Sequence, residues 1–105
     1  MENTILIYNT APNEEVAQTI AQNLVESKLA ACVSMIPTIK SVYRWQGKVE
    51  HATEVCLMIK TTEAHLEELT ARLLSLHPYT VPEIIAVPIT GGLPPYLQWI
   101  KDETS

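Results

Sequence analysis

The chain has 105 residues, of which 47% are hydrophobic, and a formal charge of −5. These values are typical of one acidic globular domain covering residues 1–105. The seven basic residues are scattered, and because they form no stripe that could follow a phosphate backbone, they argue against a nucleic-acid partner. No apolar run approaches the length of a membrane span, and Met1 to Thr4 lack the basic region of a signal peptide. We therefore expect a cytoplasmic protein with no transmembrane segment, unless a leader has been removed.

The first half of the chain predicts a strand, a helix and a longer strand. Residues 5–8 form a short apolar run followed by a turn, as in a buried strand. Asn13 is the predicted N-cap of a helix that ends near Ser27 and carries apolar residues at helical spacing. Residues 29–45 then predict a strand that is interrupted at Pro37.

The second half predicts a returning strand, another helix and a last strand. Gln46-Gly47 is a tight-turn signal, so residues 48–60 form the second arm of a hairpin. Thr62 is the predicted N-cap of the next helix. The apolar face of that helix consists of Leu66, Leu69, Leu73 and Leu76. Residues 83–89 predict a strand that Pro88 restricts to an edge or a bulge.

This order of elements, completed by a short helix over residues 96–102, predicts the fold class. It is the βαββαβ order of α+β ferredoxin-like domains with an added C-terminal helix. Right-handed crossovers place both main helices on one face of a four-stranded antiparallel sheet.

The hairpin over residues 29–60 is too long for the domain that carries it. Each arm has about 14 residues and extends about 45 Å, whereas the expected radius of gyration of such a chain is about 13 Å. The hairpin must therefore protrude, and it exposes apolar side chains such as Val42, Tyr43, Trp45 and Val49. Because a protruding apolar ribbon needs a covering partner, we expect an obligate oligomer.

The two cysteines are predicted to be structural and free. With the hairpin turn at Gln46-Gly47, Cys32 faces a position near Thr61, and Cys56 faces a position near Pro37. The two thiols then lie several residues apart along the ribbon, and a bulge at Pro37 would shift the pairing by only one residue. Neither a disulfide nor a shared metal ion is therefore expected.

The segment "HPYTVPEII" at residues 77–85 concentrates ionisable and rigid residues. His77 and Glu83 could act as an acid–base pair or bind a metal ion together, with Tyr79 beside them. In a structural interpretation, Pro78 ends the preceding helix at His77, and Pro82 stiffens the entry to the last strand. The sequence of this segment alone leaves both interpretations open.

Five motifs extend a resemblance over nearly the whole chain. They are "KLAACVSMIP" at 28–37, "YRWQGKVE" at 43–50, "EVCLMIKTT" at 54–62, "HPYTVPEI" at 77–84 and "YLQWI" at 96–100. In this combination the chain resembles the CutA family of divalent-cation tolerance proteins. The resemblance implies a ferredoxin-like domain in a tight trimer, joined edge to edge through its sheets and long hairpins. It also implies a similarity to trimeric PII signalling proteins, whose clefts between subunits bind small effectors.

The family resemblance implies a set of ligand-cleft and metal-binding residues. The cleft candidates are Tyr43, Trp45, Lys60, His77, Tyr79, Glu83, Tyr96 and Trp99. Bacterial members proposed to bind copper have a Cys in the first strand and a His-His pair before Pro-Tyr, where this chain has Asn9 and Leu76-His77. Losing a thiolate and an imidazole removes soft copper ligands. The expectation is therefore no required cofactor, and weak binding of Cu(II) or another divalent cation by His77 and Glu83.

These observations favour a non-enzymatic, trimeric, PII-like protein of divalent metal ion (copper) tolerance. One alternative is an enzyme or an effector-binding signalling protein that uses His77 and Glu83 in an interface cleft. The other is a structural adaptor whose trimer presents a surface to a protein partner.

Overall fold

The computed structural model describes residues 3–105. Met1 and Glu2, part of the N-terminal segment considered above, lie outside the described residues. The elements in chain order are β1 (Thr4–Ala11), α1 (Glu14–Glu26), β2 (Cys32–Trp45), β3 (Lys48–Thr62), a 3₁₀ turn (Glu63–His65), α2 (Leu66–Leu76), β4 (Ile84–Pro88) and α3 (Pro94–Glu103). The strands form one antiparallel sheet in the order β2-β3-β1-β4. The predicted ferredoxin-like order is confirmed, and Pro88 lies on an edge strand as expected.

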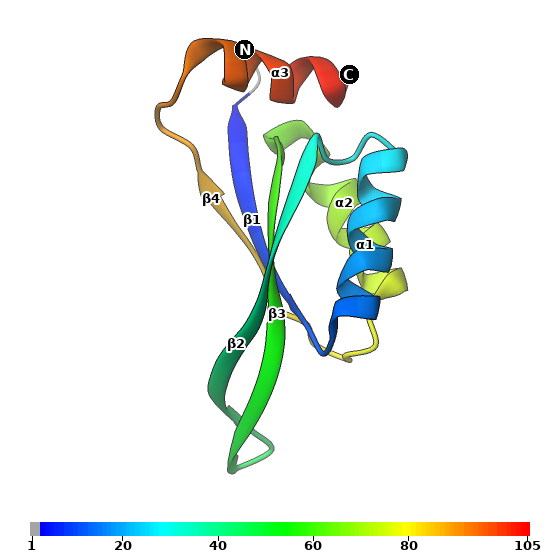
Figure 1. Ribbon diagram of the computed structural model, residues 1–105, viewed down its shortest axis with the longest axis vertical. Coiled ribbons are helices and arrows are strands. Elements are labelled where there is room, and N and C mark those ends of the chain that lie inside the picture. Colours follow the sequence, from blue (N-terminus) through cyan, green and yellow to red (C-terminus); the bar gives the residue numbers. More distant parts are fainter. Residues whose placement is uncertain (1–2) are drawn as a thin grey trace.

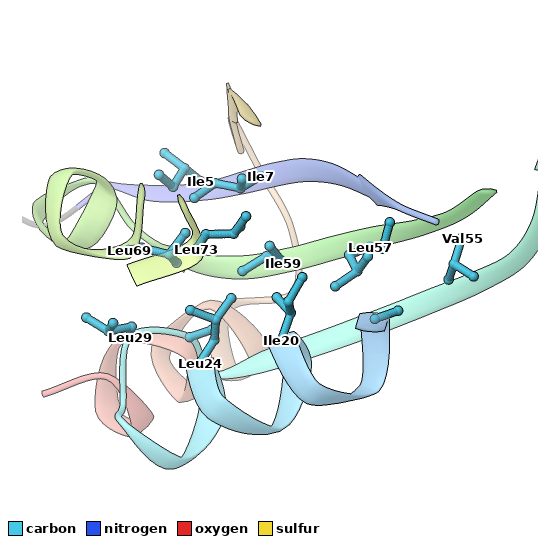
Figure 2. Close-up of a cluster of buried hydrophobic side chains, with 13 residues drawn as sticks. Ile5, Ile7, Ile20, Leu24, Leu29, Val55, Leu57, Ile59, Leu69 and Leu73 are labelled. Carbon is cyan, nitrogen blue, oxygen red and sulfur yellow. The ribbon is translucent and has the colours of Figure 1, made fainter. Parts of the chain in front are cut away.

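The core lies between the sheet and the two helices α1 and α2, which cover one of its faces (Figure 1). Alternate residues of the central strands β1 and β3 point toward these helices. Figure 2 shows the contacting side chains, among them Ile5, Ile7, Leu57 and Ile59 of the strands and Ile20, Leu24, Leu69 and Leu73 of the helices. Burying each such side chain stabilises the fold by about 1.5–3 kcal/mol. This layer holds the sheet in register, because a slip of one residue would turn the apolar set toward solvent.

The helix starts agree with the sequence predictions in position and differ in detail. Asn13 caps α1 as predicted, since its side-chain oxygen accepts a 2.9 Å hydrogen bond from the amide of Val16. Thr62 is the N-cap of a 3₁₀ turn that leads into α2, and not of α2 itself. Its side chain does not cap the turn, because its hydroxyl lies 2.7 Å from Nδ1 of His65. The closing helix begins at Pro94, earlier than expected, because proline is well suited to the first turn of a helix.

The hairpin of β2 and β3 protrudes beyond the helices, as predicted (Figure 1). Its arms contain 14 and 15 residues, and the molecule measures 43 × 25 × 23 Å. The tip is the expected tight turn, in which Gln46 and Gly47 both have positive φ, 51° and 80°. This combination matches the twist of the two arms and favours glycine at the second position.

A bulge near Pro37 changes the pairing of the hairpin arms by one residue. The register shifts between Ile36 and Ile39, so Cys32 pairs with Lys60 and Cys56 pairs with Ile36. Each cysteine is therefore one residue away from the partner expected without a bulge. The two thiols remain well separated along the ribbon and are free, as predicted. Within residues 3–105, every helix falls short of the length and apolarity needed to cross a membrane.

Candidate functional site

A cleft of about 700 Å³ lies along the protruding part of the hairpin. One wall is the stretch 41–45 of β2, and the other is the loop 78–83 between α2 and β4. Glu54 of β3 and Thr10 of β1 complete the lining. The volume is within the usual range of small-molecule sites.

His77 fixes the start of the loop that forms one wall. Its backbone is extended, with ψ of 135°, because Pro78 disfavours the helical region for the preceding residue. The ring is buried, with Nε2 2.8 Å from the carbonyl oxygen of Thr10, and Nδ1 accepts a 3.1 Å hydrogen bond from the amide of Tyr79. Since Nδ1 accepts, Nε2 must carry the proton and donate to Thr10. His77 is therefore a neutral side chain that joins the loop to β1.

Tyr79 and Glu54 link the loop to the hairpin. The Tyr79 hydroxyl donates a 2.8 Å hydrogen bond to Oε2 of Glu54, whose side chain is only 6% exposed. Burial, the hydrogen bond to Glu54 and the charges of Glu54 and Tyr43 raise the pKa of Tyr79 to about 12. The phenol is therefore neutral at physiological pH and serves as a donor to the carboxylate.

Glu83 lies at the end of the loop and is exposed. Its backbone carbonyl accepts a 2.9 Å hydrogen bond from Nδ2 of the Asn9 side chain, which anchors this end of the loop to β1. Burial, followed by the charge of Glu83, raises the pKa of the Cys56 thiol. The Glu83 carboxylate thus lies near Cys56, with its own side chain available to the cleft that it lines.

Three of the predicted cleft residues form a separate cluster near α3. Nζ of Lys60 donates a 2.6 Å hydrogen bond to the hydroxyl of Ser34 and lies 3.8 Å from the sulfur of Cys32. The rings of Tyr96 and Trp99 lie 5.5 Å apart, between centroids, on α3. Burial, together with Cys32, raises the pKa of Tyr96.

The structure thus divides the eight predicted cleft residues. Tyr43, Trp45, Tyr79 and Glu83 line the cleft, and His77 precedes its loop wall without lining it. Lys60, Tyr96 and Trp99 lie elsewhere. The sequence prediction missed Glu54. The sequence feature that could have identified it is a charged residue directly before the apolar stretch of β3.

The predicted metal residues are placed in different environments. Both ring nitrogens of His77 have partners in the chain, so a metal ion would have to displace Thr10 or Tyr79 from one of them. The Glu83 carboxylate is exposed. No group of three or more His, Cys, Asp or Glu side chains within residues 3–105 is arranged to hold a metal ion. As folded, the pair therefore does not offer a ready chelate.

The fold defines a ferredoxin-like α+β domain with an extended hairpin, and comparison with known proteins identifies its family. The family model described as CutA1 divalent ion tolerance protein matches residues 5–103. The chain belongs to this family.

Relatives match along the length of the chain. The divalent-cation tolerance protein CutA of Thermus thermophilus is 51% identical over 104 residues, which cover 99% of each chain. The chloroplastic protein CutA of Arabidopsis thaliana is 48% identical over 96% of this chain, which spans only 56% of that longer protein. The crystal structure of CutA from Xylella fastidiosa has a TM-score of 0.95 and 46% identity, covering 98% of this chain and 99% of that one. The resemblance inferred from the five motifs is confirmed.

Proposed function

We propose that this chain is a non-enzymatic, PII-like homotrimer that acts in tolerance of divalent metal ions, copper among them. The observation that carries the proposal is membership, along residues 5–103, of a family described by divalent ion tolerance. The neutral, doubly hydrogen-bonded state of His77 supports a non-enzymatic role. A general base needs an acceptor within reach of its substrate, and the only acceptor of this ring is occupied by Tyr79.

The open face of the sheet supports self-association. Ile85 and Val87 of β4 pair with Tyr8 and Leu6 of β1. Tyr8 and Leu6 alternate with the core residues of β1, so all four side chains point to the face of the sheet opposite α1 and α2. Ile36, Ile85 and Val87 are 45%, 53% and 42% exposed. An apolar face of this kind needs a cover. The two edge strands of the sheet, β2 and β4, differ from each other. If the β2 edge of one copy pairs with the β4 edge of the next, successive copies can close a ring.

The cellular test is growth in copper. A strain that lacks its own family member is grown across a series of copper concentrations, with and without this chain. We expect the chain to restore growth, and expect Ile85→Asp, which places a charge on the open face, to abolish the rescue. Equal growth with and without the chain would contradict a role in copper tolerance.

The proposal includes weak binding of a divalent ion by Glu83 and His77. The exposed Glu83 carboxylate supports it, and the need to break one hydrogen bond of His77 accounts for the weakness. Calorimetric titration with Cu(II) and Zn(II) tests it, with His77→Ala and Glu83→Gln as variants. We expect smaller heats for both. Glu83→Gln tests the site independently, because the His77 variant could lose binding through a disturbed loop. Unchanged binding heats in both variants would refute this site.

The proposed compartment is the cytoplasm. Two free cysteines support it, because thiols persist in reducing compartments. Labelling with a thiol reagent that does not cross membranes tests it: intact cells should leave the chain unlabelled, whereas the lysed, denatured sample should label at both cysteines. Labelling in intact cells would contradict this location.

A further inference from the structure

We propose that the cleft along the protruding part of the hairpin binds a small organic cation, a protonated or quaternary amine, with Glu54 as its charged anchor. The inference rests on the proposed function in treating this cleft as a ligand site, and it requires that the proposed trimer leave the cleft open to solvent. It assigns a chemical class to the ligand and a role to a residue outside the HPYTVPEI motif.

The first step is the incomplete pairing of Glu54. Its side chain is 6% exposed, and the Tyr79 hydroxyl occupies Oε2. Among residues 3–105, no other side chain donates to Glu54, and no basic group forms an ion pair with it. Burying a carboxylate without a counter-charge is unfavourable. A cation in the cleft would supply that charge at the open oxygen, Oε1.

The second step is the aromatic lining. Tyr43 and Trp45 lie two residues apart on β2, so strand alternation directs their side chains to the same face. Both are 44% exposed and line the cleft, and Tyr79 lines the opposite wall. Aromatic rings attract cations through their negative faces, and rings combined with carboxylates are the usual cage for alkylated ammonium groups.

The third step is the balance of charge. The cleft lining includes two carboxylates, Glu54 and Glu83, and one basic residue, Arg44, which alternates with Tyr43 and Trp45 along β2 and so points to the opposite face of the strand. Acidic charge therefore exceeds basic charge in the cleft, which favours a cationic ligand. Since the volume is about 700 Å³, the cleft is far larger than a bare ion needs. Val81, 69% exposed, offers apolar surface to the alkyl groups of an amine.

The test uses choline as the cationic probe and 3,3-dimethylbutan-1-ol as its neutral analogue of the same shape. Each is titrated into the full chain by calorimetry, and by tryptophan fluorescence in a Trp99→Phe background, so that Trp45 alone reports. We expect saturable binding of choline with one site per chain, and binding of the alcohol at least tenfold weaker. Equal affinity for the two probes, or no saturable binding of choline, would overturn the proposal.

Glu54→Gln is the decisive variant, because it keeps the shape of the side chain and an acceptor for Tyr79. We expect it to weaken choline binding at least tenfold, whereas Glu67→Gln, on the exposed surface of α2, should leave the affinity unchanged. Tyr43→Leu provides a second variant, which removes a ring without changing the charge and should also weaken binding. Unchanged affinity in both Glu54→Gln and Tyr43→Leu would refute the site.

The outcomes separate this inference from the proposed function. A trimer that binds copper and restores copper tolerance but does not bind choline would refute only the organic-cation site. A chain that binds choline through Glu54 but restores no copper tolerance would refute the metal role and leave the cation site standing.

Discussion

The hydroxyl of Tyr79 donates a 2.8 Å hydrogen bond to the carboxylate of Glu54, 25 residues earlier in the chain. Glu54 belongs to the hairpin and Tyr79 to the loop after α2, so this bond ties the protruding ribbon to the body of the domain. Both residues line the cleft. The contact therefore contributes both to stability and to the shape of the candidate site.

Replacing Tyr79 by Phe should destabilise the protein by about 1–3 kcal/mol, because a buried carboxylate loses its donor. Urea unfolding at one fixed protein concentration measures the effect, since association would make stability depend on concentration. Tyr43→Phe is the control, because Tyr43 is 44% exposed and its hydroxyl makes no hydrogen bond to Glu54. Equal stability of the two variants would contradict the structural role of the bond.

Tyr79 also predicts a dependence of stability on alkaline pH. Its pKa is raised from 10.0 to about 12 in the folded chain. Below pH 10 both folded and unfolded states keep the proton, and the full stabilisation is present. Between pH 10 and 12 the unfolded state releases the proton first, so stability falls. Phenolate absorbance should show a titration step near pH 12, and Tyr79→Phe should remove that step.

Replacing His77 by Ala should destabilise the protein by about 1–3 kcal/mol, because the Thr10 carbonyl and the Tyr79 amide lose their partner. Hydrogen exchange at the Tyr79 amide should accelerate at the same time. His51→Ala removes an exposed imidazole from β3 and should change stability little. An unchanged exchange rate at Tyr79 in the His77 variant would show that the ring does not hold the loop.

Association should depend on the open face of the sheet. Light scattering of the wild-type chain should give three times the 11.7 kDa of one chain at micromolar concentration. Ile85→Asp should lower this mass, because it places a charge on the apolar face opposite the helices. Leu74→Asp, a matched change at a 48% exposed position of α2, should keep it. A wild-type chain that scatters as a monomer would refute the trimer.

Several features were predictable from local patterns. The spacing of Leu66, Leu69, Leu73 and Leu76 identified the second helix, and all four belong to or pack against the core. Gln46-Gly47 identified the tip of the hairpin. These features depend on neighbours in the chain, where periodicity and turn chemistry are informative.

The candidate site was only partly predictable. Tyr43, Trp45, Tyr79 and Glu83 were correctly grouped, whereas Lys60, Tyr96 and Trp99 belong to a second cluster near α3. The importance of Glu54 was missed, because its burial depends on the loop around Tyr79 packing against the hairpin. Such long-range contacts leave no periodic signal in a single sequence.

By itself, the sequence determined the order of elements, the length of the hairpin and the family, because these follow from apolar spacing, turn residues and motifs that are local in the chain. Only the tertiary structure decided the protonation of His77 and the environment of Glu54. The ring has a defined tautomer because Thr10 and Tyr79 occupy its two nitrogens. Glu54 is buried beside one donor, and no basic group among residues 3–105 forms an ion pair with it. Both the tautomer of His77 and the environment of Glu54 depend on contacts between segments that are distant in the sequence. Thr10 contacts His77, and Tyr79 contacts Glu54.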